Sequence, residues 1–262
     1  ACVDASVEFE SAMAGVAKTT DLTDDELAAM GEQFKQMSTE MPATATELAG
    51  IAETAGQLGI KKDNIAAFAR VMADLGVATD LTADEAATLL ARFANVTGMA
   101  PGLYENLGSV VVALGNNFAT TESEIVAMGQ RLASAGELAG LSEAEIMALA
   151  AAMSSVGIEA EAGGTAMTQT LSAIEKAVAS GSDSVDEFAR VAGMSASEFA
   201  DKWRSTPIEA LQAFISGLGR LDAEGESATV VLDNLGMSGV RQSNMLKSLG
   251  LASDVLTGAV NT

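Results

Sequence analysis

Residues 140–158 read GLSEAEIMALAAAMSSVGI and contain each signal that defines one short helix. Ser142 is followed three residues later by Glu145, the capping box in which each side chain accepts a hydrogen bond from the other residue's backbone N–H. Apolar side chains then recur at helical spacing up to Gly157, which an apolar residue follows. Glycine in that place is typical of a helix end, because it adopts the left-handed conformation easily. The segment therefore predicts a helix with one buried face and two sharp ends.

The same start and stop signals recur along the whole chain. Capping boxes are predicted at Thr23/Glu26, Thr82/Glu85, Thr121/Glu124, Ser142/Glu145, Ser184/Glu187, Ser195/Glu198 and Thr206/Glu209, the last with Pro207 at the first helical position. Glycine stops are predicted at Gly59-Ile60, Gly76-Val77, Gly140-Leu141, Gly157-Ile158, Gly193-Met194, Gly236-Met237 and Gly250-Leu251. Even Val110-Val111-Val112 fits within a helix. We predict an all-α fold of about a dozen short to medium helices in a compact or elongated module.

Two apolar stripes indicate which side chains form the core. One contains Ile65, Phe68, Ala69, Met72 and Leu75; the other contains Ile146, Leu149, Ala150, Met153 and Val156. The predicted core residues are Phe34, Leu58, Ile65, Phe68, Met72, Leu75, Leu89, Phe93, Ile146, Met153, Leu171, Ile174, Phe188, Phe199, Trp203, Leu211, Phe214, Leu232 and Leu235.

The two stripes also indicate an internal duplication. A shift of 81 positions aligns Gly59 with Gly140, Ile65 with Ile146, Met72 with Met153, Gly76 with Gly157 and Leu90 with Leu171. We therefore predict a duplicated multi-helix region at 21–180, with copies at about 21–100 and 102–180. A leading helix or linker at 1–20 precedes it, and a helical region at 181–262 follows. Because the sequence begins with Ala1 and not with methionine, we interpret it as a piece of a longer polypeptide.

The charge balance argues against nucleic-acid binding and against contact with an anionic membrane. The chain has 14 basic and 36 acidic residues, a formal net charge of −22, and Lys61-Lys62 is its one adjacent basic pair. Phosphate recognition needs clustered Lys and Arg. The sequence also contains no apolar run long enough to span a bilayer. Its single cysteine, Cys2, allows no disulfide within the chain and suits a reducing cytoplasm.

No residue set in the sequence predicts catalysis, a metal site or a cofactor site. Histidine, the commonest general base and metal ligand, is absent from the chain. The acidic run Asp24-Asp25-Glu26 falls in the first turn of a predicted helix, where the helix dipole favours acids. Gly163-Gly164 follows no strand and has no neighbouring lysine, unlike a phosphate-binding loop. We predict no enzyme activity, no catalytic or metal-binding residue and no cofactor.

Several stretches resemble tailed-bacteriophage tail tape-measure proteins, and they cover nearly the whole chain in order. The resemblance is carried by 193–214 (GMSASEFADKWRSTPIEALQAF), 217–221 (GLGRL) and 232–242 (LDNLGMSGVRQ), and upstream by 9–13 (FESAM), 73–79 (ADLGVAT) and 157–167 (GIEAEAGGTAM). The family supplies no catalytic residue to place on these positions, which agrees with the residue-level reading.

The resemblance implies a structural segment of a tail-length ruler in the virion. Such a protein lies in the lumen of the tail tube or at the tail tip, after assembly in the host cytoplasm. It organises tube and tip assembly and leaves ahead of the DNA during ejection. The implied partners are further copies of itself, with a trimer as the specific expectation, the tail tube protein, and the distal tail or baseplate hub proteins.

The expected short helices differ from those of a measuring rod, and an alternative function stays open. The many capping boxes and glycines divide the chain into short helices, whereas a measuring rod is expected to consist of long ones. We therefore expect a folded module near one end of the ruler. The alternative from another class is a generic acidic helical scaffold or adaptor; a stalk of long heptad-repeat helices is excluded by the glycine stops.

Overall fold

The structure, a computed structural model, describes residues 2–221 and 223–262. Ala1, the first residue of the predicted leading region, and the side chain of Cys2 lie outside this description. The described residues form fifteen α-helices and two 3-10 turns, include no strand, and make the chain 79% helical. The predicted all-α fold is confirmed, and Val110-Val111-Val112 lies within a helix, Tyr104–Asn117.

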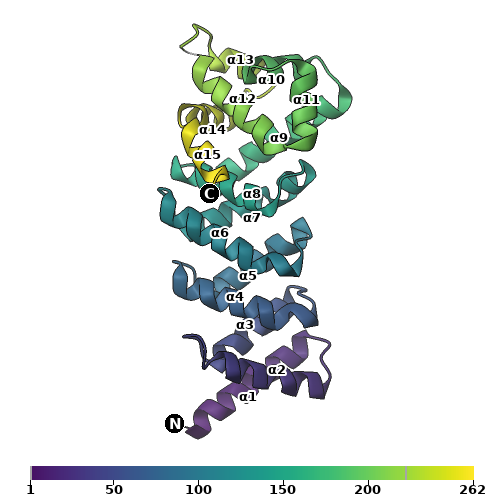
Figure 1. Cartoon of the computed structure of the whole chain (residues 1–262), viewed down its shortest axis with the longest axis vertical. Coiled ribbons are helices and arrows are strands. Elements are labelled where there is room, and N and C mark those ends of the chain that lie inside the picture. The colour runs from purple at the N-terminus through teal and green to yellow at the C-terminus, as the bar shows by residue number, and fades with distance from the viewer. Residues whose placement is uncertain (1, 222) are drawn as a thin grey trace. The chain divides into compact units, whose positions relative to one another are not determined.

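The chain divides into two compact units, residues 1–112 and 113–262. Unit 1 contains α1 (Cys2–Thr19), α2 (Asp24–Met37), α3 (Ala45–Gln57), η1 (Lys62–Asn64), α4 (Ile65–Ala78), α5 (Ala83–Thr97), η2 (Pro101–Leu103) and the first part of α6 (Tyr104–Asn117). Helix α3 lies at its centre and packs against α1, α4 and α5. In Figure 1 the helices α2 to α5 follow one another, joined by short turns.

Unit 2 contains the end of α6 and nine further helices. They are α7 (Glu122–Leu138), α8 (Glu143–Ser155), α9 (Ala160–Ser180), α10 (Ser184–Ala192), α11 (Ala196–Ser205), α12 (Pro207–Leu221), α13 (Ala228–Asn234), α14 (Val240–Leu251) and α15 (Ser253–Val260). Helix α7 packs against α8 and α9, and α12 packs against α10, α11 and α14. The short last helix α15 folds back onto α8.

Most predicted helix starts are confirmed by their hydrogen bonds. Reciprocal capping boxes form at Thr23/Glu26, Thr82/Glu85, Ser142/Glu145 and Ser195/Glu198. At the start of α7 the Thr121 hydroxyl accepts a hydrogen bond from the Glu124 backbone N–H. A further complete box, Thr44/Glu47, begins α3 and was not predicted.

Two predicted boxes are wrong, and their acidic side chains form ion pairs with nearby basic residues. Ser184 is the first residue of α10 and not its cap, and Glu187 forms an ion pair with Arg190 at 2.9 Å. Helix α12 begins at Pro207 as predicted, but Glu209 pairs with the ammonium group of Lys202. The backbone N–H of Thr206 bonds instead to the carbonyl of Lys202 at 2.7 Å, because Thr206 is the residue that ends α11.

Five of the predicted glycine stops are confirmed and two are wrong. The confirmed stops have positive φ and are Gly59, Gly140, Gly157, Gly193 and Gly236. Gly76 and Gly250 lie inside α4 and α14, and the apolar residues after them, Val77 and Leu251, are 60% and 80% exposed. Both glycines permit close approach of another helix: a Cβ on either would lie 2.9 Å from a backbone nitrogen, that of Ala83 or Gly219 respectively.

The predicted core is largely confirmed. The buried members are Phe34, Ile65, Phe68, Met72, Leu75, Phe93, Ile146, Met153, Leu171, Ile174, Phe188, Phe199, Trp203, Leu211, Phe214 and Leu232. Leu58, Leu89 and Leu235 are only half-buried. Leu58 and Leu235 are the cap residues after the last turns of α3 and α13, where a helix no longer presents a single face to its neighbours.

Candidate functional site

Within the acidic run at the start of α2, Glu26 has a role in the helix start. The Glu26 carboxylate caps the backbone of Thr23 and forms an ion pair with Lys62 at 2.7 Å. The Lys62 hydrogen bond, and then the Thr23 backbone, lower the pKa of Glu26 to about 2. Nowhere in residues 2–221 and 223–262 do three or more potential ligands gather as a metal site would need.

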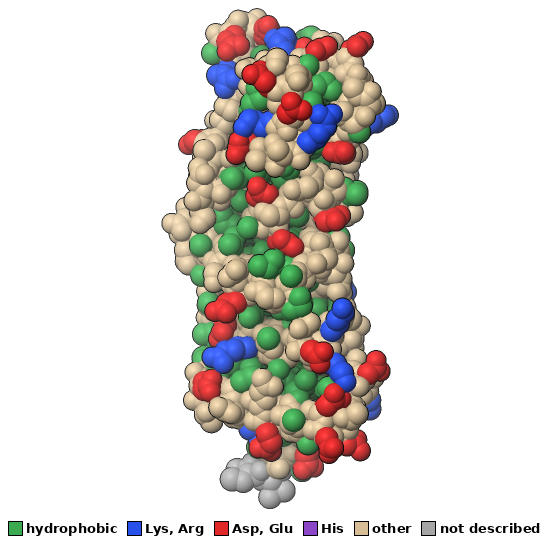
Figure 2. All heavy atoms as spheres, turned by 45° about the vertical axis from the view of Figure 1, so that its right-hand side comes forward, with side chains coloured by type: hydrophobic (Ala, Val, Ile, Leu, Met, Phe, Trp, Pro, Cys, Tyr) green, Lys and Arg blue, Asp and Glu red, His purple; other side chains and the backbone are tan. Residues whose placement is uncertain are grey.

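No helix in the described part of the chain is long and apolar enough to cross a bilayer. On the face in Figure 2 acidic side chains occur throughout, and the basic ones form no continuous patch.

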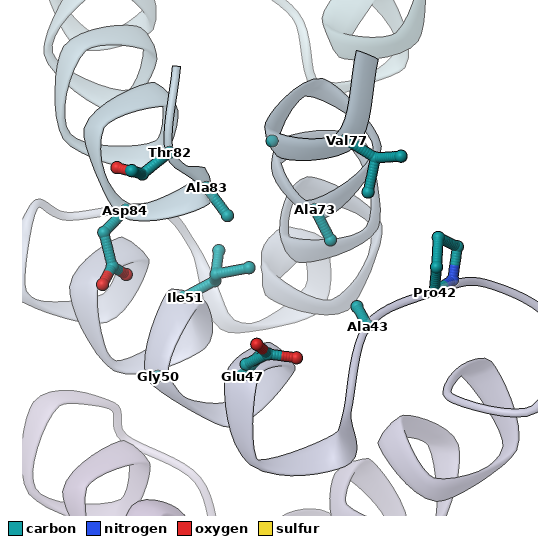
Figure 3. A pocket seen from close by; sticks show the side chains of 11 residues that line it. Pro42, Ala43, Glu47, Gly50, Ile51, Ala73, Val77, Thr82, Ala83 and Asp84 are labelled. Atoms are coloured by element: carbon teal, nitrogen blue, oxygen red, sulfur yellow. The ribbon is translucent and has the colours of Figure 1, made fainter. Parts of the chain in front are cut away.

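Besides a groove of about 570 Å³ between α1 and α2, unit 1 contains one of about 440 Å³ between α3, α4 and the start of α5. This volume lies within the range of about 300–1,000 Å³ that is usual for ligand pockets. Its apolar lining includes Ile51, Ala73 and Val77 (Figure 3). Figure 3 also shows Glu47 at the start of α3, and Asp84 reaching from the start of α5 towards α3. No basic residue lines the groove. The site is therefore a shallow apolar trough with acidic margins.

Gly50 lies in the middle of α3 and lines the groove. A glycine in a helix interior costs about 1 kcal/mol relative to alanine, so it usually serves a packing purpose. Among the α-helical glycines of the described residues, Gly50 is the one whose added Cβ would meet no heavy atom within 4 Å. The packing of this chain therefore does not account for a glycine at this position.

A second groove, of about 370 Å³, lies in unit 2 between α7, α8 and the start of α9. Six of its lining residues correspond, through the 81-position shift, to residues of the first groove. The pairs are Pro42 with Ser123, Ala43 with Glu124, Glu47 with Met128, Ala73 with Ser154, Gly76 with Gly157 and Val77 with Ile158. The two grooves thus occur at matching places in the two predicted copies.

The local backbone at the ends of α3 and α7 also matches. Gly59 and Gly140 have φ of +87° and +81°. The N–H groups of Ile60 and Leu141 bond to the carbonyls of Ala55 and Gly136, at 3.0 and 2.9 Å. The following helix differs, because α4 continues through Gly76 whereas α8 ends before Gly157. Superposition of 59–90 on 140–171 stays a prediction.

The sequence-level reading did not identify either groove. Gly50 carries no signal in the sequence, because glycine is frequent in this chain and the residues after it, IAET, are typical of an ordinary helix. An alignment of the two copies does contain a signal: where the first copy has Gly50, Ala43 and Ala73, the second has Arg131, Glu124 and Ser154. Positions with a small residue in the first copy and a larger polar residue in the second therefore mark the place of the first groove.

Comparison with known proteins gives two matches. The sequence profile of a family described as "Phage-related minor tail protein" matches residues 31–236. The "Probable tape measure protein" of Halomonas phage phiHAP-1 is 25% identical over 176 residues, which cover 62% of this chain and 20% of that protein. The chain thus matches only about a fifth of the length of this relative. No solved structure matches the chain.

Proposed function

Because the chain belongs to the family of phage-related minor tail proteins, we propose that it is a segment of a tail tape-measure protein. Family membership itself implies a structural role in the tail of a virion. The finer assignment is supported by the similarity to the probable tape measure protein of phage phiHAP-1. It is also supported by the stretches from 9–13 to 232–242 that resemble tape-measure proteins in order along the chain.

The proposed position is the lumen of the tail tube or the tail tip. There the segment helps to set tail length, organises assembly of the tube and tip, and leaves ahead of the DNA. The net charge of −22 supports this position, because an acidic chain repels the DNA that must follow it through the same channel. The proposed partners are further copies of the chain, with a trimer as the specific expectation, the tube protein and the distal hub proteins. The proposal includes no catalytic step and no cofactor.

Electron cryomicroscopy of phage particles tests the position. The parent gene would carry a short recognisable tag after residue 262, and the tag would be located with a bound antibody fragment in opened tails. We expect the label inside the tube or at the tip, and we expect its loss from particles that have released their DNA. Label on the outer tail surface, or label retained in emptied particles, would contradict the proposal.

Passage through the tail requires the segment to become narrow. A compact chain of 262 residues has a radius of gyration of roughly 18 Å, whereas one helix with its side chains is about 10–12 Å across. We propose that the segment unfolds easily before release, since its helices are short and its core contains few aromatic residues. Thermal denaturation of the isolated chain checks this. A chain that stays folded well above about 80 °C would argue against the idea, because mesophilic domains usually melt near about 45–65 °C.

A further inference from the structure

The two copies differ in the side chains next to their grooves. In unit 2 the position aligned with Gly50 is Arg131 (131 − 50 = 81). Its side-chain stem lies against Gly164 of α9, because a Cβ added to Gly164 would lie 2.8 Å from Cβ of Arg131. Gly164 is aligned with Ala83, which lines the first groove (164 − 83 = 81). The stem of Arg131 therefore occupies the gap between α7 and α9. The aligned gap of unit 1, between α3 and α5, is bordered by Gly50 and has no such stem.

Lining side chains of the second groove also make contacts that the first groove lacks. A Cβ added to Gly163 would lie 2.1 Å from Cγ2 of Ile158, so Ile158 packs against the start of α9. Its aligned residue Val77 is 60% exposed. The Ser154 hydroxyl donates to the Glu124 carboxylate at 2.9 Å, whereas the aligned residues Ala73 and Ala43 have no polar group. The polar side chains Ser154 and Glu124 of the second groove are thus paired within the chain, whereas the aligned alanines give the first groove only methyl groups.

The charges of the first groove complement a cation. Both hydrogen bonds of the Glu47 carboxylate to Thr44 use Oε2, which leaves Oε1 for another donor. Asp84 offers a second carboxylate at the start of α5 (Figure 3). A guanidinium group has five N–H donors in a planar fork, so it can bond carboxylates on two sides, and its aliphatic stem packs on apolar surface.

We propose that the groove at Gly50 is a docking site for a protein segment that inserts an arginine side chain between α3 and α5. The contact between α7 and α9 shows how such a side chain fits, because the stem of Arg131 lies against Gly164 at the aligned position. The absence of a side chain at Gly50 lets the partner's backbone approach α3 closely. The residues that flank the arginine must accordingly be small and apolar, to match Ile51 and Ala73. The proposal concerns the surface of unit 1 and stands whether or not the segment lies in the tail tube.

Nuclear magnetic resonance of the full 15N-labelled chain tests the proposal. The probe is the blocked pentapeptide AVRAA, and the comparison probe replaces its arginine with citrulline, which has the same shape but no charge. We expect saturable shifts at the amides of Gly50 and Ala83 and none at Arg131 or Gly164. Citrulline should weaken binding by about tenfold, because it removes charge-assisted hydrogen bonds. The same loss is expected for Asp84→Asn, whereas Asp74→Asn, an exposed carboxylate outside the groove, should leave the affinity unchanged.

A plugged variant gives a second, independent readout. Gly50→Arg places in unit 1 the side chain that unit 2 carries, so it should abolish peptide binding while the circular dichroism spectrum stays helical. If Gly50→Arg does not fold, the comparisons with Asp84→Asn and with the citrulline peptide still test whether an arginine binds in the groove. Shifts spread over the acidic surface, equal shifts with citrulline, or no shifts at millimolar peptide would overturn the proposal. It would also be overturned if the peptide has no effect while Gly50→Arg removes a dimer seen by sedimentation, since the occupant would then be a second copy.

Discussion

Glycines at helix crossings set how closely the helices of unit 2 approach one another. A Cβ added to Gly217 of α12 would lie 1.8 Å from the carbonyl oxygen of Val191, and one added to Gly219 would lie 2.0 Å from that of Gly250. Backbone atoms cannot rotate away as a flexible side chain can. A methyl group at either position therefore forces the two helices apart.

Gly217→Ala and Gly50→Ala should change stability in opposite directions. Gly217→Ala should lower the free energy of unfolding by about 2–3 kcal/mol, because overpacking displaces backbone. Gly50→Ala should raise it by about 0.5–1 kcal/mol, because the added methyl meets nothing within 4 Å and alanine favours the helix. Urea denaturation of both variants measures these changes. Equal urea midpoints for the two variants would contradict the packing described here.

At the level of the helices, the capping boxes link stability to pH. The Ser195 hydroxyl and then the Ser195 backbone lower the pKa of Glu198 below its ordinary value of 4.5. The same hydrogen bonds at Thr44 and Thr82 lower the pKa values of Glu47 and Glu85. A carboxylate with a lower pKa in the folded chain stabilises the fold above its unfolded pKa. This stabilisation is lost as the pH falls through the folded value.

Glu198→Gln isolates this effect for α11. The natural chain should be more stable than the variant at about pH 7, and the difference should shrink as the pH falls from about 4.5 towards 3. Taking the difference at each pH cancels the general relief of repulsion as other acidic residues protonate. Urea midpoints of both chains over this range provide the measurement. A difference that stays constant down to about pH 3 would show that the carboxylate charge plays no part in the cap.

A buried polar contact joins α9 to α14. Gln242 Nε2 donates to the Thr170 hydroxyl at 3.0 Å, and both side chains are buried. Thr170→Val should cost about 1–3 kcal/mol of stability, because it leaves the buried amide without its acceptor. The double variant Thr170→Val with Gln242→Leu leaves no unpaired donor at this contact. Its loss of stability should therefore be smaller than the sum of the losses of the two single variants. Additive costs in a double-mutant cycle would argue against the contact.

The helix starts could be predicted from the sequence, and the role of each glycine could be predicted only in part. A capping box is made by residues three apart, so Ser142 and Glu145 contain all the information needed for their helix start. Whether a glycine ends a helix or lies at a crossing depends on a partner far along the chain. Gly250 reads as a stop, yet it lies inside α14 because Gly219 packs against it. The open groove at Gly50 escaped prediction for the same reason.

At the scale of the whole molecule, the uncompensated charge should make stability depend on salt. The chain carries a formal net charge of −22, and the repulsion between its carboxylates favours expanded states. Raising sodium chloride from about 10 mM to about 150 mM shortens the screening length from about 30 Å to about 8 Å. The melting temperature should therefore rise over this range, as measured by differential scanning calorimetry. Replacing sodium with calcium at equal ionic strength should add no further rise; a calcium-specific gain of several degrees would mean that carboxylates form a metal site.

The burial of helix α8 has a consequence for the protein while it is being synthesised. Every residue from Ile146 to Met153 is buried, and part of the cover comes from α15, which begins at Ser253. The ribosome must therefore add 100 further residues (253 − 153) before that cover begins to emerge. At about 5–20 residues per second this takes roughly 5–20 s, during which the apolar surface of α8 is incompletely covered. Nascent chains stalled within this interval should recruit chaperones that chains released at full length no longer bind.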